Sequence, residues 1–399
     1  RMTAPGRNLM MADIRVKFVS QKISKIRWRP CSRQGLDSSD VFATGSWDDE
    51  SNSVSMWHLP GDSQGDEDME GDVSDELVEK EPRLLCETLH RGDVQDLQFL
   101  GMEHLITASS SGTVSVFRHH PNSQVIGVSQ EWDKLHTFPS QNNCSCTSVA
   151  SQDETIVSCG EDGKMNVLIV GRRPPLKRID NADSCTINDV IFLKQSEVVT
   201  VNSTGQLKVY DLRQPSDQPT SLFLVTGDQT ALLCIDKHPT QHHVVAAGGQ
   251  DGVLSVWDLR QEKYPVTLLE AHSAAMWEVK FHPNHPDHLF TCSEDGSVWH
   301  WNASTVGAAS ASAGILAGTG AGSGGGIAFA ASMPGGSGPN PSHSCPWLTL
   351  DVSRHKMDIT SLLPTQNNLP VNSIDIERQI LLCGTDEEAI YAMELPAIR

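Results

Sequence analysis

The sequence has few basic residues: 30 Lys and Arg stand against 50 Asp and Glu, which gives a formal net charge of -20. A protein that binds a nucleic-acid backbone needs a basic face to neutralise the phosphates, so we expect no direct contact with nucleic acid. No stretch approaches the roughly 18 apolar residues of a membrane-spanning helix, and the first residues do not resemble a signal peptide. We therefore expect no membrane insertion and no secretion.

Motifs for metals, cofactors and catalysis are also absent or weak. The ten Cys residues form no Cys-x-x-Cys pair, and Cys144 and Cys146 stand too close together for the usual zinc spacing. Neither a phosphate-binding P-loop nor a His-Glu-x-x-His motif occurs. A Gly-x-Gly-x-x-Gly pattern at residues 320–325 lacks the strand and helix that a dinucleotide site needs, so we attribute it to low complexity. We expect no catalytic residue, cofactor, metal or small-molecule substrate.

What the sequence does contain is a repeated hairpin pattern. Residues 248–258 read GGQDGVLSVWD, and residues 291–302 read TCSEDGSVWHWN. Each copy has a short apolar segment, an Asp-Gly turn and an alternating segment that reaches a Trp. Asp-Gly between such segments predicts a β-hairpin, because both residues tolerate the positive φ of tight turns. Related turn pairs recur at Asp48-Asp49, Ser111-Gly112, Asp162-Gly163, Thr204-Gly205, Asp251-Gly252, Asp295-Gly296 and Asp386-Glu387.

Seven turn pairs predict an all-β fold, the seven-bladed β-propeller. The gaps between successive pairs are about 62, 51, 42, 47, 44 and 91 residues. A WD-type blade has roughly 40–45 residues, so each middle gap corresponds to one blade and the two end gaps contain insertions. Six residues after the first residue of the pair, six of the seven blades have an aromatic residue or a weaker substitute: Phe117, Leu168, Tyr210, Trp257, Trp301 and Ala392.

A single domain is expected over residues 14–399, preceded by a disordered or expression-derived tail at 1–13. Inside the domain, two disordered insertions are expected, an acidic one at 61–82 and a Gly/Ala/Ser-rich one at 303–345. The second is Gly, Ala or Ser at 27 of the 36 positions from 303 to 338. Such compositions cannot bury enough apolar surface to become ordered. Both insertions join the third and fourth strands of a blade, so we expect them on the same face of the ring.

A propeller must close its ring, because an incomplete blade exposes an unpaired strand edge. Only three strand-like segments, VNSIDI, QILLCG and AIYAME, follow residue 370. The missing outer strand of the last blade is predicted to be residues 14–20 (IRVKFVS), so that both ends of the chain share one sheet. Residues 347–350 (WLTL) are predicted to complete the sixth blade.

The pattern resembles the WD-repeat family, whose units carry Gly-His near the start and Trp-Asp at the end. Trp257-Asp258 and Ala271-His272 come close to that signature. The resemblance implies that a loop His, a second-strand Ser or Thr, a turn Asp and a third-strand Trp hydrogen-bond within each blade, fully in one blade and partly in the others. The residues expected to shape turns and blades are Asp162, Gly163, Asp251, Gly252, Trp257, Asp258, His272, Thr291, Asp295, Gly296 and Trp301.

Other polar residues are interpreted structurally. His238-Pro239 and His282-Pro283 follow predicted inner strands and are expected to form turns rather than metal or catalytic sites. Trp277 on an inner strand could anchor a partner near the channel mouth or pack against the next blade. An acidic residue recurs on the inner strands: Asp96, Asp189, Asp236 and Glu278. These residues could form a ring of carboxylates around the channel. The same positions in WD repeats usually accept hydrogen bonds from neighbouring loops, and we favour this second interpretation.

A more specific resemblance is to the small WD-repeat nucleoporins of the Y-shaped scaffold complex of the nuclear pore. It lies in residues 18–30, 271–301, 359–364 and 381–394. It implies a non-catalytic scaffold of the outer rings at the nuclear envelope, bound to the α-solenoid nucleoporin of the short arm. It also implies roles in mRNA transport, protein transport and translocation, and at kinetochores in mitosis. The sequence has no Phe-Gly dipeptide, so it is not expected to belong to the disordered transport barrier.

Two other classes stay open at this point. One is a WD-repeat adaptor that binds a substrate or histone peptide over the channel, and the other is a propeller enzyme with His and carboxylate residues at one channel end. The acidic insertion could recruit a basic partner or could be a solvated loop. The partner-binding residues are not predicted, but we expect binding at the face without insertions or at the blade edge near the ring closure.

Overall fold

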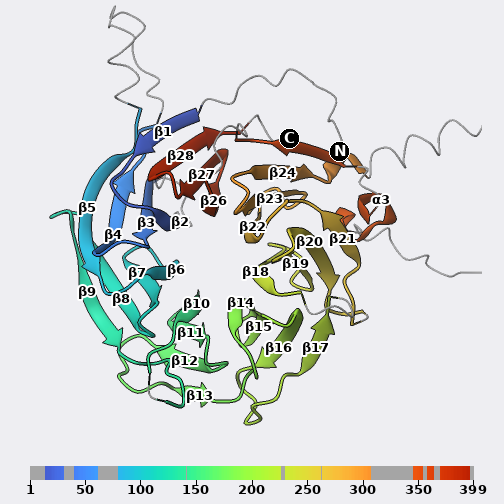
Figure 1. Cartoon of the computed structure of the whole chain (residues 1–399), viewed down its shortest axis with the longest axis horizontal. Helices are drawn as coiled ribbons and strands as arrows, with labels where there is room; N and C mark the ends of the chain where they lie inside the picture. The colour runs from blue at the N-terminus through green and yellow to red at the C-terminus, as the bar shows by residue number, and fades with distance from the viewer. Residues whose placement is uncertain are drawn as a thin grey trace, which may run out of the picture.

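Seven four-stranded antiparallel sheets stand around a central axis as the blades of a ring (Figure 1). The fold is therefore the seven-bladed propeller expected from the seven turn pairs. The structure is a computed structural model, and it describes residues 14–30, 40–61, 80–140, 142–225, 230–261, 263–306, 345–353, 357–363 and 369–395. In the part of the chain so described, no helix is long and apolar enough to cross a membrane.

Within each blade the strands follow one another from the inside of the ring to its rim. From inner to outer strand, blade one consists of β2 (Ile23–Trp28), β3 (Val41–Ser46), β4 (Asn52–His58) and β5 (Arg83–His90); blade two of β6 (Val94–Leu100), β7 (His104–Ser109), β8 (Val114–His120) and β9 (Val125–Trp132); and blade three of β10 (Cys146–Gln152), β11 (Thr155–Gly160), β12 (Met165–Ile169) and β13 (Lys177–Ile179). Blade four consists of β14 (Ile187–Lys194), β15 (Glu197–Asn202), β16 (Gln206–Asp211) and β17 (Ser221–Leu224), and blade five of β18 (Leu232–Lys237), β19 (Val244–Gly249), β20 (Val253–Asp258) and β21 (Thr267–Glu270). Blade six consists of β22 (Met276–Phe281), β23 (His288–Ser293), β24 (Val298–Asn302) and β25 (Asp358–Ser361), and blade seven of β26 (Val371–Glu377), β27 (Ile380–Thr385), β28 (Ala389–Glu394) and β1 (Ile14–Phe18).

Burial follows the position of a strand in its blade. Every residue of β3, β19 and β23 is buried, because the second strands are covered by neighbouring blades on both sides and can carry nearly continuous apolar runs. The outer strands β5 and β9 lie at the rim and alternate between exposed and covered residues. The core therefore lies between blades, and the rim carries the surface that other molecules can reach.

The turn between the second and third strands needs glycine for two reasons. Gly163 and Gly252 have φ values of 69° and 77°, which side chains rarely adopt. A Cβ atom at either position would also collide with a backbone carbonyl oxygen of the loop that leads to the next blade. In blade seven, Glu388 occupies this left-handed position with a φ of 57°. The predicted pair Asp386-Glu387 is thus wrong by one residue.

The shift in blade seven also moves its aromatic position. Trp257 lies opposite Val245, the second residue of β19, and Met393 lies opposite Leu381, the second residue of β27. Met393 is therefore the counterpart of the Trp, and the assignment to Ala392 is wrong. This turn has Glu388 at the position where other blades have Gly. Because Glu does not indicate a turn in a sequence, the turn was predicted one residue too early.

The two ends of the described chain meet in blade seven. Strand β1 pairs antiparallel with β28, from Ile14 opposite Met393 to Phe18 opposite Ala389, and both lie in one sheet in Figure 1. The backbone N–H of Val19 donates to the carbonyl of Glu388 just beyond this pairing. The outer strand of the last blade therefore comes from the other end of the chain, and β28 has no open edge.

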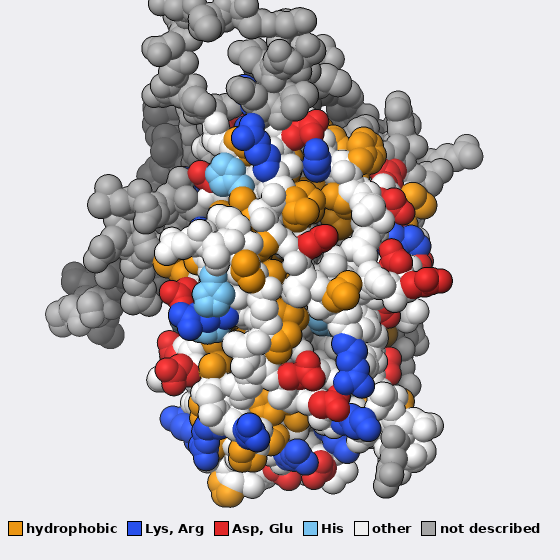
Figure 2. Space-filling model, turned by 90° about the vertical axis from the view of Figure 1, so that its left-hand side faces the viewer, with side chains coloured by type: hydrophobic (Ala, Val, Ile, Leu, Met, Phe, Trp, Pro, Cys, Tyr) orange, Lys and Arg blue, Asp and Glu red, His pale blue; other side chains and the backbone are white. Residues whose placement is uncertain are grey.

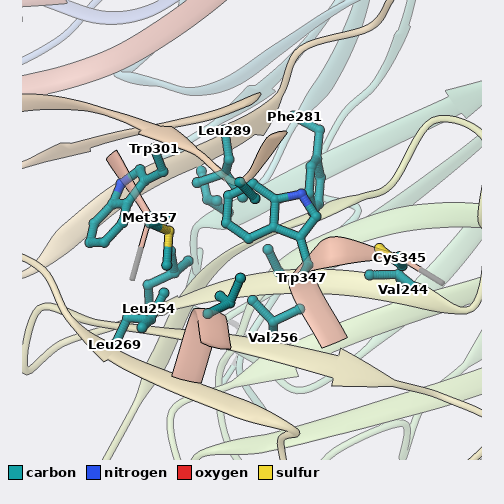
Figure 3. Close-up of a cluster of buried hydrophobic side chains, with 14 of the residues drawn as sticks. Val244, Leu254, Val256, Leu269, Phe281, Leu289, Trp301, Cys345, Trp347 and Met357 are labelled. Carbon is teal, nitrogen blue, oxygen red and sulfur yellow. The ribbon is translucent and has the colours of Figure 1, made fainter. Parts of the chain in front are cut away.

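The prediction that residues 347–350 complete blade six is wrong. Residues Pro346–Leu348 form a short 3-10 helix, η1, followed by the helix α3 (Leu350–Ser353), and the outer strand is β25. The Trp347 side chain is completely buried in the cluster between blades five and six (Figure 3). Its indole N–H donates to the Pro286 carbonyl at 2.8 Å, and its ring meets Phe281 edge-on at 5.9 Å. Burial of one large ring outweighs the strand-like alternation of the segment.

Most of the two predicted insertions, residues 62–79 and 307–344, lies outside the described residues, as does the predicted tail at 1–13. The Gly-x-Gly-x-x-Gly pattern lies outside them too. The ends of the second insertion are part of the fold, because Ala303, Val306 and Cys345 are buried in the same cluster as Trp347. The first insertion follows β4 and the second follows β24, and both are the third strands of their blades.

Candidate functional site

Blade six contains a polar network made of the four residues that the WD-repeat resemblance implies. His272 Nε2 lies 2.8 Å from Thr291 Oγ1, and the Trp301 indole N–H donates to the same oxygen at 3.0 Å. His272 Nδ1 lies 2.9 Å from Ser297 Oγ, which in turn donates to Asp295 at 2.6 Å. Because the Ser297 proton points to Asp295, His272 must donate from Nδ1, so Thr291 donates to Nε2.

The charge of Asp295 is held by this network. Burial opposes its ionisation, but hydrogen bonds from His272, Ser297 and the Ser273 backbone outweigh burial and keep its pKa well below the usual range. The Ser273 N–H donates at 2.9 Å. These bonds tie the turn of blade six to the loop that precedes its inner strand. The network thus fixes the positions of these loops, with the His272 and Thr291 side chains buried.

A second network in blade three was missed from the sequence. His136 Nδ1 lies 2.9 Å from Asp162 Oδ1, and its Nε2 lies 3.0 Å from Ser158 Oγ, with His136 and Asp162 both buried. Hydrogen bonds from His136 lower the pKa of Asp162 although burial opposes this. The sequence signal was there: His136 precedes Asp162 by 26 residues, and His272 precedes Asp295 by 23 residues.

Blade five departs from this arrangement although it carries the Trp-Asp pair. Its Trp257 indole donates to Ser255 Oγ at 3.1 Å, because the position of Thr291 is taken by Ala247. The Asp251 side chain is exposed and accepts from the Val253 N–H of its own turn at 3.1 Å. Asp258 is buried and pairs with Arg260 at 2.8 Å. Asp251 and Asp258 therefore act locally, in a turn and after a strand, rather than across the blade.

The acidic residues of the inner strands join neighbouring blades. Each carboxylate accepts a hydrogen bond from a backbone N–H on the inner strand of the next blade, which corrects the expectation that they accept from loops. An inner strand has no neighbour on its channel side, so its free N–H groups are the donors within reach. The pairs are Asp96 with Val149, Asp189 with Ile235, Asp236 with Phe281, Glu278 with Ile374 and Asp375 with Trp28, at 2.7–3.0 Å.

A buried ion network lies where blades six, seven, one and two meet. Arg27 Nη2 lies 2.7 Å from Glu278 Oε1 and 3.5 Å from Asp96 Oδ1, and Lys25 Nζ reaches Glu278 at 2.7 Å. Burial opposes the Glu278 charge, but Arg27 and Lys25 outweigh it and hold the pKa of Glu278 well below its usual range. Because removing one partner from a buried pair leaves an unpaired charge, this network ties the first blade to the second and the sixth.

The space inside the ring is small and polar. A cavity of about 60 Å³ is lined by inner-strand residues that include Arg27, Asp189 and the partly exposed Trp277. Burial and the neighbouring Asp96 raise the pKa of Asp189 to about 6, and the Ser148 hydroxyl lies 2.7 Å from Asp189 and 3.0 Å from Asp96. This cavity is smaller than the about 300–1,000 Å³ that ligand sites commonly measure.

The His-Pro pairs lie in turns after inner strands. His282 Nδ1 accepts from the backbone N–H groups of Asn284 and His285 at 3.2 and 3.1 Å, and His238 Nδ1 accepts from Gln241 in the same way. Within the described residues, no group of three or more His, Cys, Asp or Glu side chains could hold a metal ion. The nine Cys of these residues are unpaired thiols, and burial raises the pKa of Cys159 and Cys383.

A large hollow lies at the rim, where the ring closes. We call it the closure groove. It measures about 690 Å³ and lies between β1 with the following link on one side and β4 and β5 on the other. Phe18 and Leu84 stand on its two sides, and Trp57 and Thr44 form its floor. It is more than ten times the size of the central cavity.

Comparisons with known proteins agree with this architecture. The WD40 family model (WD domain, G-beta repeat) matches residues 218–258 and 263–302, which are most of blades five and six. The chain is 47% identical over 388 residues to "Nucleoporin Nup43" of Mus musculus and 45% identical over 388 residues to that of Homo sapiens, and each alignment covers 96% of this chain and 98% of the relative. It is 28% identical over 155 residues to "Nuclear pore complex protein nup43" of Dictyostelium discoideum, covering 39% of this chain and 36% of the relative.

Proposed function

The chain belongs to the Nup43 family of nucleoporins, and on that premise we propose that it is a non-catalytic scaffold subunit of the Y-complex in the outer rings of the nuclear pore. Membership of the family supports a scaffold role in the nuclear pore. We propose in addition that the protein belongs to the Y-complex and binds one particular partner there. The partner is the α-solenoid nucleoporin of the short arm.

The observation that carries this proposal is identity at 45–47% over 96% of the chain, which covers all seven blades and not only the WD repeats. Propeller folds host many functions, so the fold alone would indicate no more than a platform for binding. The small central cavity and the histidines engaged in structural networks also favour a scaffold over an enzyme.

Support of mRNA export and protein import, and a place at kinetochores in mitosis, belong to the same proposal. They rest on the resemblance of residues 18–30, 271–301 and 381–394 to the small WD-repeat nucleoporins. Depletion of the protein and rescue with the full chain would test them separately, by nuclear poly(A) RNA, import of a reporter and chromosome alignment. Rescue of pore assembly without rescue of alignment would remove the mitotic part alone.

Affinity purification of the tagged full chain from nuclear-envelope extract tests the main proposal. We expect scaffold nucleoporins of the Y-complex in near-equal amounts, including an α-solenoid subunit. Recovery with ubiquitin-ligase adaptors or histone-binding complexes, without nucleoporins, would overturn it in favour of a substrate or histone-peptide adaptor. Deletion of residues 62–79 together with 307–344 is expected to leave the recovery of nucleoporins unchanged, because none of the residues proposed to bind the partner lies in these two segments.

A further inference from the structure

The closure groove exposes apolar side chains on both of its sides. Phe18 on β1 is 71% exposed and Leu84 on β5 is 47% exposed. Leu89, further along β5 and outside the lining of the groove, is 75% exposed. Leu89 and Phe18 are the two most exposed large hydrophobic residues among those that the structure describes. Single exposed apolar residues are ordinary on soluble proteins, but apolar residues gathered at one hollow indicate a binding surface.

Figure 2 views this side of the ring, over blades one and two and the closure, and shows hydrophobic side chains in a band between charged ones. Strands β5 and β9, each of eight residues, are the longest outer strands, whereas β13, β17, β21 and β25 have three or four. The rim is therefore tallest where the apolar residues are exposed, and a partner finds more surface here than elsewhere.

Several polar groups of the groove are already engaged with one another or with the backbone. The Trp57 indole N–H of the floor donates to Thr44 Oγ1 at 2.9 Å, and Gln21 donates to the Ser51 carbonyl. Lys17 and Glu81 pair at 3.0 Å at the groove edge. An occupant therefore has few hydrogen-bonding groups to satisfy, and contact with the apolar faces supplies the binding energy. This is the chemistry of a docking surface and not of a catalytic pocket.

One end of the groove is acidic. The turn between β3 and β4 holds Asp48, Asp49 and Glu50, all exposed, and the next-door turn of blade seven ends in the exposed Glu388. The charged residues that line the groove itself balance, with Lys17 and Arg83 against Glu81 and Glu87. The basic residue Lys22 pairs with Asp48 at 2.6 Å, so it offsets only part of this charge. A segment that carries Lys or Arg beside its apolar residues is complementary to such a surface.

We infer that the closure groove docks an amphipathic helix of the α-solenoid partner, with apolar residues against Phe18, Leu84 and Trp57 and with Lys or Arg residues at the helix flank facing the acidic turns. The inference rests on the proposed function for the helical nature of the occupant, since an α-solenoid presents helices and their loops. A helix that binds in a groove has apolar residues three and four positions apart in its sequence. This spacing defines the segment to look for in the partner.

Charged substitutions on both sides of the groove test this in the full chain. The variant Phe18→Glu with Leu84→Glu alters two exposed side chains, so it should fold. The matched control, Leu222→Glu with Leu268→Glu, places the same charges on β17 and β21, where both residues are 40% exposed. We expect the groove variant to reduce recovery of the α-solenoid subunit by about tenfold or more, the loss typical of a central interface residue, while the control variant and both melting temperatures stay near wild type.

A photo-reactive amino acid at position 84 identifies the occupant. A cross-linked peptide from an α-solenoid nucleoporin, apolar at helical spacing and flanked by Lys or Arg, supports the inference. A peptide from a second copy of this chain, or one with alternating strand-like sequence, overturns it. If the wild type recovers no scaffold nucleoporin, the proposed function fails; if the wild type and the groove variant recover it equally, only the inference about the groove fails.

Discussion

Blades six and seven are neighbours in the ring, yet they are stabilised in different ways. In blade six, Thr291 on the second strand joins His272 and Trp301 in one hydrogen-bonded network. In blade seven the equivalent positions are Cys383 and Met393, which offer almost no hydrogen bonding. Blade seven instead takes its outer strand from the other end of the chain and receives the Glu278 carboxylate from blade six.

The difference shows that a blade can be fixed from within or from its surroundings. Blade six is made of neighbouring strands and a turn network, with a long connection only before its outer strand. Blade seven depends on pairing between residues more than 370 positions apart along the chain. Closing so long a loop costs chain entropy, which the hydrogen bonds of one short strand and the contacts between blades must offset. One deletion, two substitutions and a change of pH probe this contrast, from the largest expected effect to the smallest.

Removal of residues 14–20 should have the largest effect. Without β1 the edge of β28 is open and the apolar cluster of blade seven is exposed, so we expect loss of a single cooperative unfolding transition and appearance of oligomers. Thermal unfolding with size-exclusion chromatography measures both. Removal of residues 1–13 is the control and should change neither. A stable monomer after removal of 14–20 would show that strand pairing does not hold blade seven in place.

Glu278→Gln comes next, because it leaves the buried Arg27 and Lys25 without their carboxylate. We expect a loss of about 3–5 kcal/mol in the free energy of unfolding, measured by urea denaturation at neutral pH. The control is Glu103→Gln, which breaks the exposed pair with Arg118 and should change stability by less than about 1 kcal/mol. Equal losses in the two variants would mean that the buried ion network does not stabilise the contact of blade one with blade six.

Thr291→Val tests the network inside blade six. The substitution keeps the shape of the side chain but leaves His272 Nε2 and the Trp301 indole without a partner, and it should cost about 1–3 kcal/mol. The control is Thr200→Val at the same strand position in blade four, where the buried hydroxyl has no hydrogen-bond partner. That variant should be neutral or slightly stabilising. A loss of the same size at both sites would assign the effect to packing.

Acidification should weaken blade six by the smallest amount. His288 Nδ1 and His300 Nε2 lie 2.8 Å apart, and burial lowers the pKa of each to about 4. Because the unfolded chain binds these protons near pH 6.5 and the folded chain does not, the stability that this pair contributes is present above pH 6.5 and is lost as the pH drops toward 4. We expect the pair to account for a loss of about 1 kcal/mol between pH 6.5 and pH 6, reduced in His300→Gln. An unchanged pH profile in that variant would exclude the pair as the cause.

Much of the ring could be predicted from the sequence, because a hairpin is encoded in about a dozen consecutive residues. Asp251-Gly252 and Asp295-Gly296 mark turns by the φ that Gly adopts, and the count of strands after residue 370 leaves one place for residues 14–20. The set His272, Thr291, Asp295 and Trp301 followed from the WD-repeat resemblance. The turn of blade seven was predicted one residue too early, because Glu388 replaces the Gly that indicates the turn in other blades.

Contacts between blades escaped the sequence because their partners are far apart along the chain. Asp96 and Glu278 were placed on inner strands but expected to accept hydrogen bonds from loops, and only the packed ring brings them to the inner strand of the next blade. Trp347 was predicted to lie in a strand, but its ring is buried in the cluster between blades five and six. The closure groove has no sequence pattern at all, because Phe18 and Leu84 come from different blades.

By itself, then, the sequence determined the number of blades, the positions of most turns and the family, because these depend on residues close together or on likeness to relatives. The tertiary structure decided how blades are joined, which polar residues share a network and where an apolar hollow opens at the rim. Those features arise from side chains that meet only after the two ends of the chain pair in one sheet.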